Sequence, residues 1–268
     1  MSIKITTLVE NSVYGKGLQG EHGLSLLVDT GEHRLLFDTG ASDLFIRNAR
    51  ILGIDLKEVD FLVLSHGHRD HTGGLHHFLA VNDKAQVVCK RELFRPKFKD
   101  ERENGVMQPD ALDSTRFRFV DEVTELCRGV FVFPQLPVTD EEDTHFEHFF
   151  TWTEGRKQAD TFTDELALAL KQGAEVSVLS ACSHRGITNI IRAVQEYFPQ
   201  TSLKVVLGGF HIRNTEKEKF DVIARFLESH LPQRLGVCHC TGIDKYALFH
   251  QCFADRTFYN YTGRVETL

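Results

Sequence analysis

Short apolar segments that alternate with polar positions open the chain. Residues 3–10, 24–30 and 33–39 each have the pattern of a strand, and the last two flank a tight turn at Gly31. Residues 43–52 carry apolar side chains at helical spacing, which predicts a helix. The beginning of the chain therefore predicts paired strands followed by a first helix.

An uninterrupted apolar run at residues 60–65, DFLVLS, differs from these alternating segments. Such a run is typical of a strand that is buried on both faces. A helix over 73–81 and a strand over 85–90 are predicted after it. The stretch from about 91 to 162 is mostly polar, with short antiparallel strands predicted near 117–134. Because a segment of this length is unusual inside a compact domain, we expect it to form a lid or a substrate wall.

Strands and helices alternate more regularly in the second half of the chain. A hairpin is predicted around residues 172–173, and amphipathic helices follow the later strands. The predicted strands are 165–171, 174–180, 203–208 and 234–239, and the predicted helices are 187–197, 216–230 and 243–253. Strand-rich segments thus begin each half, and strand–helix alternation follows in both.

This pattern predicts a single α/β domain over residues 1–268, with two sheets packed face to face and helices on their outer sides. A doubly wound parallel sheet is the alternative. The adjacent hairpins make that alternative less favourable, and no GxGxxG sequence follows the first strand.

Composition and charge narrow the classes of partner. The 268 residues are 41% hydrophobic and 26% charged, as in an ordinary globular protein. The net charge of -7 disfavours a nucleic-acid partner, because phosphate-backbone binding needs a basic face. The first residues lack the features of an export signal, and no long apolar run is present. We therefore expect a cytoplasmic protein with reduced cysteines, no membrane partner and a small-molecule substrate; the sequence carries no signal for an oligomeric state.

Histidines are frequent, with 14 in the chain, and metal-ligand side chains gather in HGHRDH at 66–71, directly after the buried strand. His66 and His68 are two residues apart, so in extended backbone both rings face the same way and can bind one ion. Asp70 and His71 follow the bend that a glycine allows, and could hold a second ion nearby. Imidazole with carboxylate suits zinc, iron or manganese. A histidine-rich surface turn is the alternative.

The HxHxDH pattern resembles the metal-binding motif of the metallo-β-lactamase superfamily, and LLFDTG at 35–40 resembles an Asp-Thr-Gly turn of that family. The resemblance extends over nearly the whole chain and implies a four-layer αββα sandwich. It also implies that Asp38 orients a ligand histidine from behind. EHGLSLLVDTG, SACSHRGI, GGFH and CHCTG are similar to one branch of metal-dependent hydrolases. Some members of that branch are linked to 7,8-dihydropterin-6-methyl-4-(β-D-ribofuranosyl)aminobenzene 5′-phosphate synthesis.

The same resemblance implies further ligands from the second half of the chain. His184 would complete the first ion site and His239 the second, and each follows a predicted strand. The late Asp that commonly bridges two ions in this superfamily is missing from the corresponding place, so the second ion lacks a carboxylate bridge or one site stays empty. Cys182 is a candidate substitute ligand, with a small buried thiol as the alternative. His211 and His22 are expected to contact substrate or metal, or to play a structural role.

These residues predict a metal-dependent hydrolase with one or two divalent transition metal ions, zinc first, with iron and manganese as alternatives. A bound ion lowers the pKa of its water from about 15.7 to about 7, and Asp70 is the candidate catalytic residue. The substrate would be small and polar, with a phosphorylated or pterin-like molecule as the specific candidate. The alternatives are an iron-dependent oxidoreductase or dioxygenase of the same fold, and a ligand-binding sensor that retains metal without turnover.

Overall fold

A computed structural model describes residues 2–268 of the chain. The chain divides into two compact units, and each unit combines segments that are distant in sequence. The first unit comprises the chain up to Val120, Glu147–Asp164 and Tyr261–Leu268, and the second comprises Asp121–Phe146 and Glu165–Asn260. The sequence predicts a single domain over residues 1–268. The division into two units does not decide whether they form one domain, so this stays a prediction.

A mixed sheet forms the centre of the first unit. Its strands are β1 (Lys4–Val9), β2 (Ser25–Asp29), β3 (Arg34–Phe37), β4 (Phe61–Val63), β5 (Gln86–Cys89), β8 (Phe117–Phe119) and β18 (Val265–Thr267). Within residues 2–268 the sheet has seven strands in the order β18-β1-β2-β3-β4-β5-β8. β18, β1, β2 and β3 are antiparallel neighbours, whereas β3, β4, β5 and β8 are parallel. The predicted strands of the first half are therefore present, and the hairpin around Gly31 joins β2 to β3.

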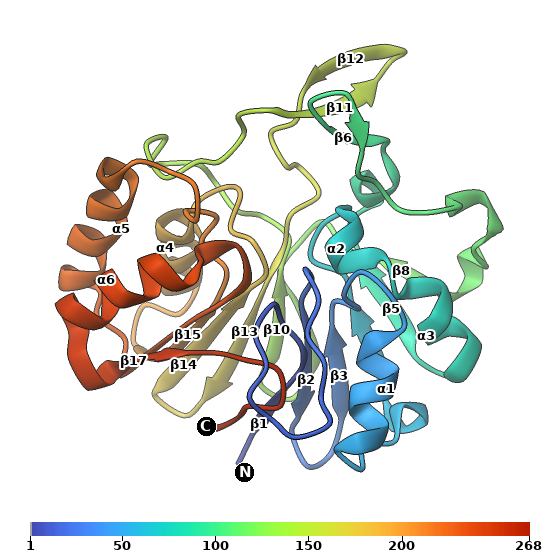
Figure 1. Ribbon diagram of the computed structural model, residues 1–268, viewed down its shortest axis with the longest axis horizontal. Coiled ribbons are helices and arrows are strands. Elements are labelled where there is room, and N and C mark those ends of the chain that lie inside the picture. Colours follow the sequence, from blue (N-terminus) through green and yellow to red (C-terminus); the bar gives the residue numbers. More distant parts are fainter. Residues whose placement is uncertain (1) are drawn as a thin grey trace. The chain divides into compact units, whose positions relative to one another are not determined.

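Helices α1 (Leu44–Ile51) and α3 (Leu75–Val81) lie beside this sheet in Figure 1. Their apolar faces place Phe45 and Phe78 in one buried cluster with strand residues such as Leu36 and Leu62. Both helices fall where the sequence predicts them, because apolar side chains recur there at the helical period.

The second unit has a sheet of its own. Its strands are β9 (Thr124–Cys127), β10 (Val130–Phe133), β13 (Ala167–Gln172), β14 (Glu175–Ser180), β15 (Ser202–Gly208), β16 (Arg234–Val237) and β17 (Thr257–Tyr259). Among the described residues this sheet has seven strands in the order β17-β16-β15-β14-β13-β10-β9. β13 and β14 form the predicted hairpin, and β14 to β17 run parallel.

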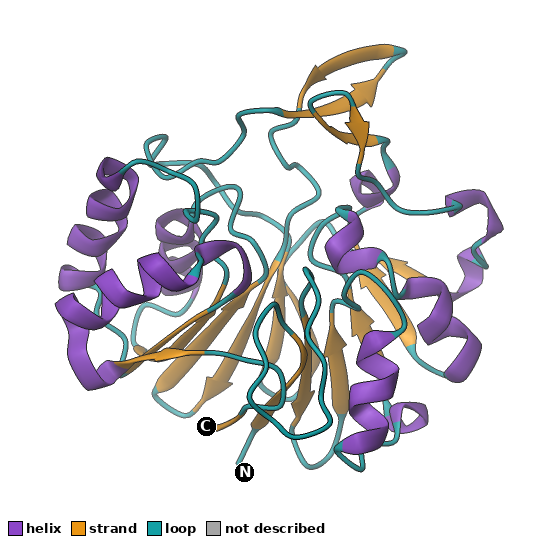
Figure 2. Cartoon of the chain, in the orientation of Figure 1, coloured by secondary structure: helices purple, strands orange, loops and turns teal. Residues whose placement is uncertain are grey.

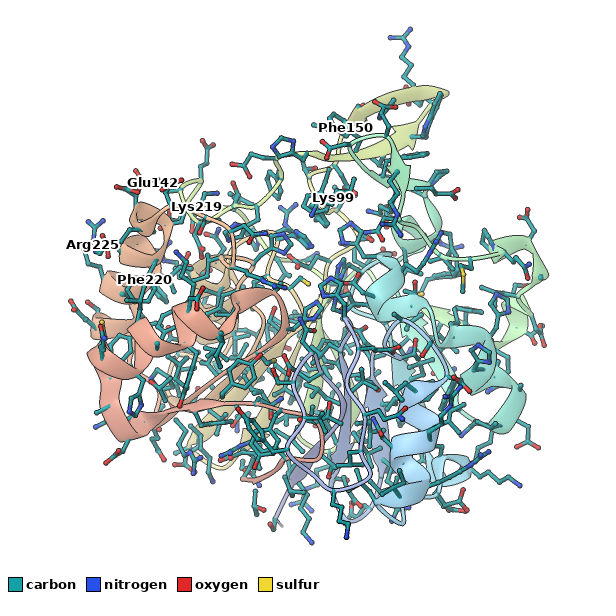
Figure 3. All side chains as sticks on the ribbon, in the orientation of Figure 1. Lys99, Glu142, Phe150, Lys219, Phe220 and Arg225 are labelled. Carbon is teal, nitrogen blue, oxygen red and sulfur yellow. The ribbon has the colours of Figure 1, made fainter. Side chains whose placement is uncertain are left out.

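Helices α4 (Ile187–Tyr197), α5 (Lys217–Ser229) and α6 (Ile243–Phe253) belong to the second unit. Phe220 of α5 packs 4.8 Å from Phe249 of α6, measured between ring centroids. Arg225 of the same helix points outward in Figure 3 and is exposed. This inside–outside contrast follows the amphipathic spacing that predicts the helix.

A small third sheet is formed by part of the segment expected to be a lid (Figure 2). Its strands are β6 (Lys97–Lys99), β7 (Arg102–Glu103), β11 (Phe149–Thr153) and β12 (Arg156–Ala159), in the order β12-β11-β6-β7. The other strands of this segment belong to the two main sheets, β8 to the first and β9 and β10 to the second. The strand pattern near 117–134 breaks after Phe119, so that β8 pairs parallel with β5 while β9 and β10 pair antiparallel.

Short helices connect these elements. They are α2 (Arg69–Thr72) and the 3₁₀ turns Leu56–Glu58, Arg91–Phe94, Pro109–Ala111, Ser114–Arg116, His239–Thr241 and Ala254–Arg256. None of the helices formed by residues 2–268 combines the length and apolar character needed to cross a membrane.

Candidate metal centre

The HGHRDH segment follows β4, and Asp38 follows the neighbouring parallel strand β3. Because the carboxyl ends of parallel neighbours meet at one edge of a sheet, the two segments lie together. Main-chain hydrogen bonds join them further: the Thr39 N–H donates to the His71 carbonyl at 2.8 Å. The HGHRDH segment that follows β4 thus forms a loop, and main-chain hydrogen bonds hold this loop at the sheet edge.

Asp38 is fully buried, and its carboxylate accepts hydrogen bonds from Ser65 and His71. The distances are 2.7 Å from the Ser65 N–H, 2.6 Å from the Ser65 hydroxyl and 2.7 Å from Nδ1 of His71. An ionised carboxylate can only accept, so Nδ1 of His71 carries the proton and Nε2 presents a lone pair. A carboxylate behind the ring is a common way to orient a metal-ligating histidine.

His66 is oriented by the same network. The Ser65 hydroxyl donates its hydrogen bond to Asp38 and lies 2.9 Å from Nδ1 of His66, from which it accepts a hydrogen bond. Nε2 of His66 then presents its lone pair, 3.2 Å from Nδ1 of His68. Two nitrogens at 2.0–2.1 Å from one tetrahedral zinc ion lie about 3.3 Å apart. The two rings therefore have the spacing of ligands that share an ion.

The rings of His66 and His68 are buried and neutral. Burial lowers the pKa of His68 from 6.5 to about 3. Burial also holds the pKa of His66 well below its usual range, and the neighbouring rings of His71 and His68 lower it further. Neutral imidazole is the form that binds a metal ion, so the site is in its ligand form at neutral pH.

The lowered pKa of His68 predicts how the stability of the metal-free protein depends on pH. As pH falls from about 6.5 toward about 3, the unfolded chain binds a proton at His68 that the folded chain does not. Stability from this group is therefore present above pH 6.5 and is lost below it, by about 2 kcal/mol at pH 5. Urea unfolding between pH 7.5 and 5 measures this loss. His68→Gln should show a shallower pH slope, and the exposed His77→Gln should keep the full slope; equal slopes in all three proteins would contradict the assignment.

Asp70 lies at the start of α2 and is only partly buried. Its Oδ2 is 3.7 Å from Nε2 of His71 and 3.3 Å from Nε2 of His22. His22 is exposed, with 64% of its side chain accessible, whereas His71 is fully buried. Asp70 therefore connects a buried ring to one that solvent reaches. The expected contact of His22 with substrate or metal stays a prediction.

Two aromatic rings cover the other side of His68. Phe149 of β11 lies 4.9 Å from the His68 ring, and Phe162 lies 5.2 Å from it at an interplanar angle of 89°. Both phenylalanines are buried. Phe149 of the small sheet and Phe162, which follows β12, therefore form an apolar wall that keeps water from this side of the histidine pair.

Gly67 is required by close packing rather than by its own backbone angles. A Cβ at this position would clash with the carbonyl oxygen of Leu93 and would lie 3.3 Å from both Oδ2 of Asp164 and Cε of Lys97. Gly67→Ala is therefore expected to destabilise the protein by about 1–3 kcal/mol, because a rigid main-chain atom must move. Thermal unfolding would measure this loss. Gly105→Ala, where the nearest atom is 3.2 Å away, should cost less, and an unchanged melting temperature for Gly67→Ala would contradict the packing described.

The predicted ligands of the second half form a cluster in the second unit. His184 follows β14, His211 follows β15 and His239 follows β16, so three parallel neighbours bring them to one sheet edge. The rings of His184 and His211 are 4.2 Å apart between centroids. Ligand atoms of Cys182, His184 and His211 all lie within 4.8 Å of one another.

Cys240, which follows His239 directly, lies at the same edge. Ligand atoms of Cys182, His239 and Cys240 also lie within 4.8 Å of one another. The thiol of Cys240 accepts a hydrogen bond from the His211 N–H at 3.3 Å. The structure therefore gathers His184, His211, His239 and Cys182 within the second unit, as it gathers His66, His68, Asp70 and His71, together with Asp38 and His22, within the first. Completion of one ion site by residues from both sets stays a prediction.

Sequence reasoning missed several residues that contact these loops. His145, in the connection after β10, is buried, and its ring centroid lies 5.5 Å from that of His211. Asp164 and Glu165 are buried carboxylates that contact the main chain of the histidine loops, through Gly67 and His184. No local pattern marks them, because their partners are far away in sequence.

The side chains fit a divalent transition metal ion. In the first unit the donor set is made of neutral imidazoles and a carboxylate, which suit zinc and iron. Asp38 fixes the tautomer of His71, and the spacing of His66 and His68 suits one shared ion. These residues therefore support metal binding at the first unit's sheet edge.

Comparison with known proteins gives relatives that extend over the whole chain. The family described as "Metallo-beta-lactamase superfamily" matches residues 18–163. The 7,8-dihydropterin-6-methyl-4-(beta-D-ribofuranosyl)-aminobenzene-5′-phosphate synthase of Methanocaldococcus jannaschii is 27% identical, over 98% of this chain and 96% of that protein. An uncharacterised protein of the same organism is also 27% identical, over 97% of this chain and 98% of its own length.

Solved structures resemble the chain as well. Tm1679, described as a metal-dependent hydrolase of the β-lactamase superfamily, is 31% identical, covers 98% of both chains and superposes with a TM-score of 0.86. The metallo-β-lactamase fold protein YhfI from Bacillus subtilis covers 100% of both chains at 12% identity and a TM-score of 0.62, which is a likeness of fold alone.

Proposed function

Because this chain belongs to the metallo-β-lactamase superfamily, we propose that it is a metal-dependent hydrolase that acts on a small polar substrate. The predicted fold class is confirmed by the structural likeness to Tm1679, and the predicted resemblance to the dihydropterin branch by the Methanocaldococcus jannaschii synthase. Activity, metal and substrate are the subject of the proposal.

One observation carries the proposal: the buried pair His66 and His68, neutral and 3.2 Å apart, beside a His71 whose tautomer Asp38 fixes. Burying three imidazoles and a carboxylate costs free energy that packing alone does not repay. Metal binding offsets this cost and gives a reason for the arrangement.

We assign His66 and His68 to one ion and Asp70 and His71 to a second, with His184 and His239 as further ligands from the second unit. When bound, the ions supply a water of lowered pKa and polarise the substrate's oxygen. Asp38 holds the proton on Nδ1 of His71 and so keeps Nε2 available. Asp70 orients the attacking water and accepts its proton at a carboxylate oxygen. The two phenylalanines beside His68 exclude bulk water from one side of the site.

We further propose that the substrate carries a phosphate or a pterin group. The name of the 27% identical synthase contains both a dihydropterin and a ribofuranosyl phosphate. Arg69, within the HGHRDH segment, has a buried Nε with no hydrogen-bond partner in residues 2–268. A guanidinium is suited to bind a phosphate through its fork of donors. Arg185 is less suited, because its Nε already donates to the Leu136 carbonyl at 2.7 Å.

A synthase activity is the second candidate, and the name of the Methanocaldococcus jannaschii relative favours it. The two activities differ in their products. A hydrolase consumes water and releases two fragments, whereas a synthase joins two substrates, and mass spectrometry of the reaction mixture separates these outcomes.

The test is a panel of chromogenic esters, thioesters and phosphate esters, assayed with added zinc or manganese. We expect turnover of at least one class, and a loss of about 100-fold or more in Asp70→Asn, because general acid–base groups contribute roughly 10²–10⁴-fold. Retained metal without turnover of any compound would favour a sensor over a hydrolase. Equal turnover in Asp70→Asn would contradict the role given to Asp70.

A further inference from the structure

Two consecutive carboxylates, Asp164 and Glu165, are buried where one compact unit of the chain ends and the next begins. Asp164 belongs to the first unit. Its Oδ2 accepts a hydrogen bond from the Gly67 N–H at 2.7 Å, which fixes the peptide between His66 and Gly67. Its Oδ1 accepts from Nζ of Lys97 at 2.6 Å. Both oxygens of this carboxylate are thus engaged, one by the histidine loop and one by strand β6.

Lys97 is the counter-ion that allows this carboxylate to be buried. The lysine is 1% exposed, and its Nζ also lies 2.7 Å from Oδ2 of Asp160. Burial by itself lowers the pKa of Lys97, but the carboxylates of Asp164 and Asp160 raise it more, so the ammonium group stays charged. A buried carboxylate that is paired and hydrogen-bonded on both oxygens is held in one position.

Glu165 belongs to the second unit and binds its histidine loop in the corresponding way. Its Oε1 accepts from the His184 N–H at 2.7 Å, and its Oε2 accepts from the Arg185 N–H at 2.8 Å. The turn begins with Ser183 in the left-handed region, at φ 54°, so consecutive N–H groups point toward one anion. The carboxylate therefore sets the path of the main chain at His184 itself.

We propose that the Asp164-Glu165 dipeptide is a positioning element that orients the two histidine loops for metal binding. This inference rests on the proposed function, since it assumes that His68 and His184 are ligands. Each carboxylate uses both oxygens as acceptors, one residue for each loop. Because the two residues are joined by a peptide bond, a displacement of this part of the chain acts on both loops.

An amide cannot replace either carboxylate. Asn at position 164 has one acceptor oxygen, so it serves either the Gly67 N–H or the Lys97 ammonium, and its NH₂ group faces the other donor. Gln at position 165 likewise serves only one of the two N–H groups of the turn. Asp164→Asn and Glu165→Gln are therefore conservative in size but remove the positioning contact.

Asp160→Asn is the matched control. Asp160 is buried and accepts from Lys97 at 2.7 Å and from the Phe162 N–H at 2.8 Å. Within residues 2–268 it makes no hydrogen bond to the main chain of a histidine loop. Asp160→Asn therefore disturbs the same kinds of contact as Asp164→Asn, one with the Lys97 ammonium and one with a main-chain N–H. A purely structural role would give these two variants the same phenotype.

The experiment is cobalt(II) titration of the full chain, read from the visible d–d absorption, with thermal unfolding of each metal-free variant alongside. We expect Asp164→Asn and Glu165→Gln to bind cobalt about 10-fold to 100-fold more weakly, with a shifted absorption band. We expect Asp160→Asn to keep the wild-type affinity and band despite a similar loss of thermal stability. Asp164→Glu, which keeps the charge but displaces the carboxylate, should shift the band as well and serves if Asp164→Asn does not fold.

Two results would overturn the inference while leaving the proposed function intact. One is wild-type cobalt binding in Asp164→Asn and Glu165→Gln. The other is an equal weakening in Asp160→Asn, which would reduce all three carboxylates to structural roles. A wild-type chain that binds no cobalt would instead contradict the proposed function, and the inference with it.

Discussion

His68→Ala is expected to lower the affinity of the protein for zinc more than about 100-fold, since removing a direct ligand should cost at least as much as removing an outer contact. The His68 ring is neutral, because its pKa is lowered to about 3, and it lies 3.2 Å from its neighbour His66. Removing the His68 ring takes away Nδ1, the nitrogen expected to bind the same ion as Nε2 of His66. Competition with a chromogenic chelator measures the change, and hydrolytic turnover should fall with the affinity.

His77→Ala is the control for this variant. His77 is exposed on α3, six residues after His71, so the substitution removes an imidazole without touching the cluster. We expect wild-type zinc affinity in this protein. If His68→Ala bound zinc as tightly as His77→Ala, the assignment of His68 as a ligand would be wrong.

Asp38→Asn is expected to weaken both zinc binding and folding. The carboxylate accepts from the Ser65 N–H, the Ser65 hydroxyl and Nδ1 of His71, and an amide NH₂ cannot accept. His71 would then shift its proton to Nε2, which removes the lone pair from the ligand side. We expect zinc affinity to fall about 10-fold to 100-fold and stability to fall by about 2 kcal/mol.

The chain offers a matched control for this pair. Asp60 lies 3.2 Å from Nδ1 of His33 and 3.2 Å from the Arg34 N–H, but this second His–Asp pair is partly exposed. Asp60→Asn should therefore cost less than about 1 kcal/mol and leave zinc binding unchanged. A similar loss in both variants would show that Asp38 has no special role behind a metal ligand. Urea unfolding and zinc titration decide between these outcomes.

The sequence was sufficient for the elements that repeat a simple period. Strands β1 to β3, the β13–β14 hairpin and helices α4 to α6 follow alternating or helical spacing, and β4 and β5 are short apolar runs, so local pattern predicts them. The HGHRDH loop could also be found from local sequence. Its ligands lie within six residues, and the apolar run before it places them at a strand end.

The remaining parts depend on contacts between distant residues. Asp164 reaches Gly67 across 97 positions, and Lys97 reaches Asp164 across 67, so no window of sequence shows either contact. Strand β6 lies in polar sequence and β11 is a short aromatic segment, and the two pair with each other across a long connection. Their alternation is too short to mark them as strands before the pairing is known.

X-ray absorption at the zinc edge of the zinc-loaded, desalted protein shows whether imidazole rings bind the metal. We expect retained zinc with nitrogen or oxygen neighbours at about 2.0–2.1 Å and the multiple-scattering pattern of imidazole rings. Zinc lost on desalting, or retained zinc without imidazole scattering, would contradict the claim that these buried histidines form a metal centre.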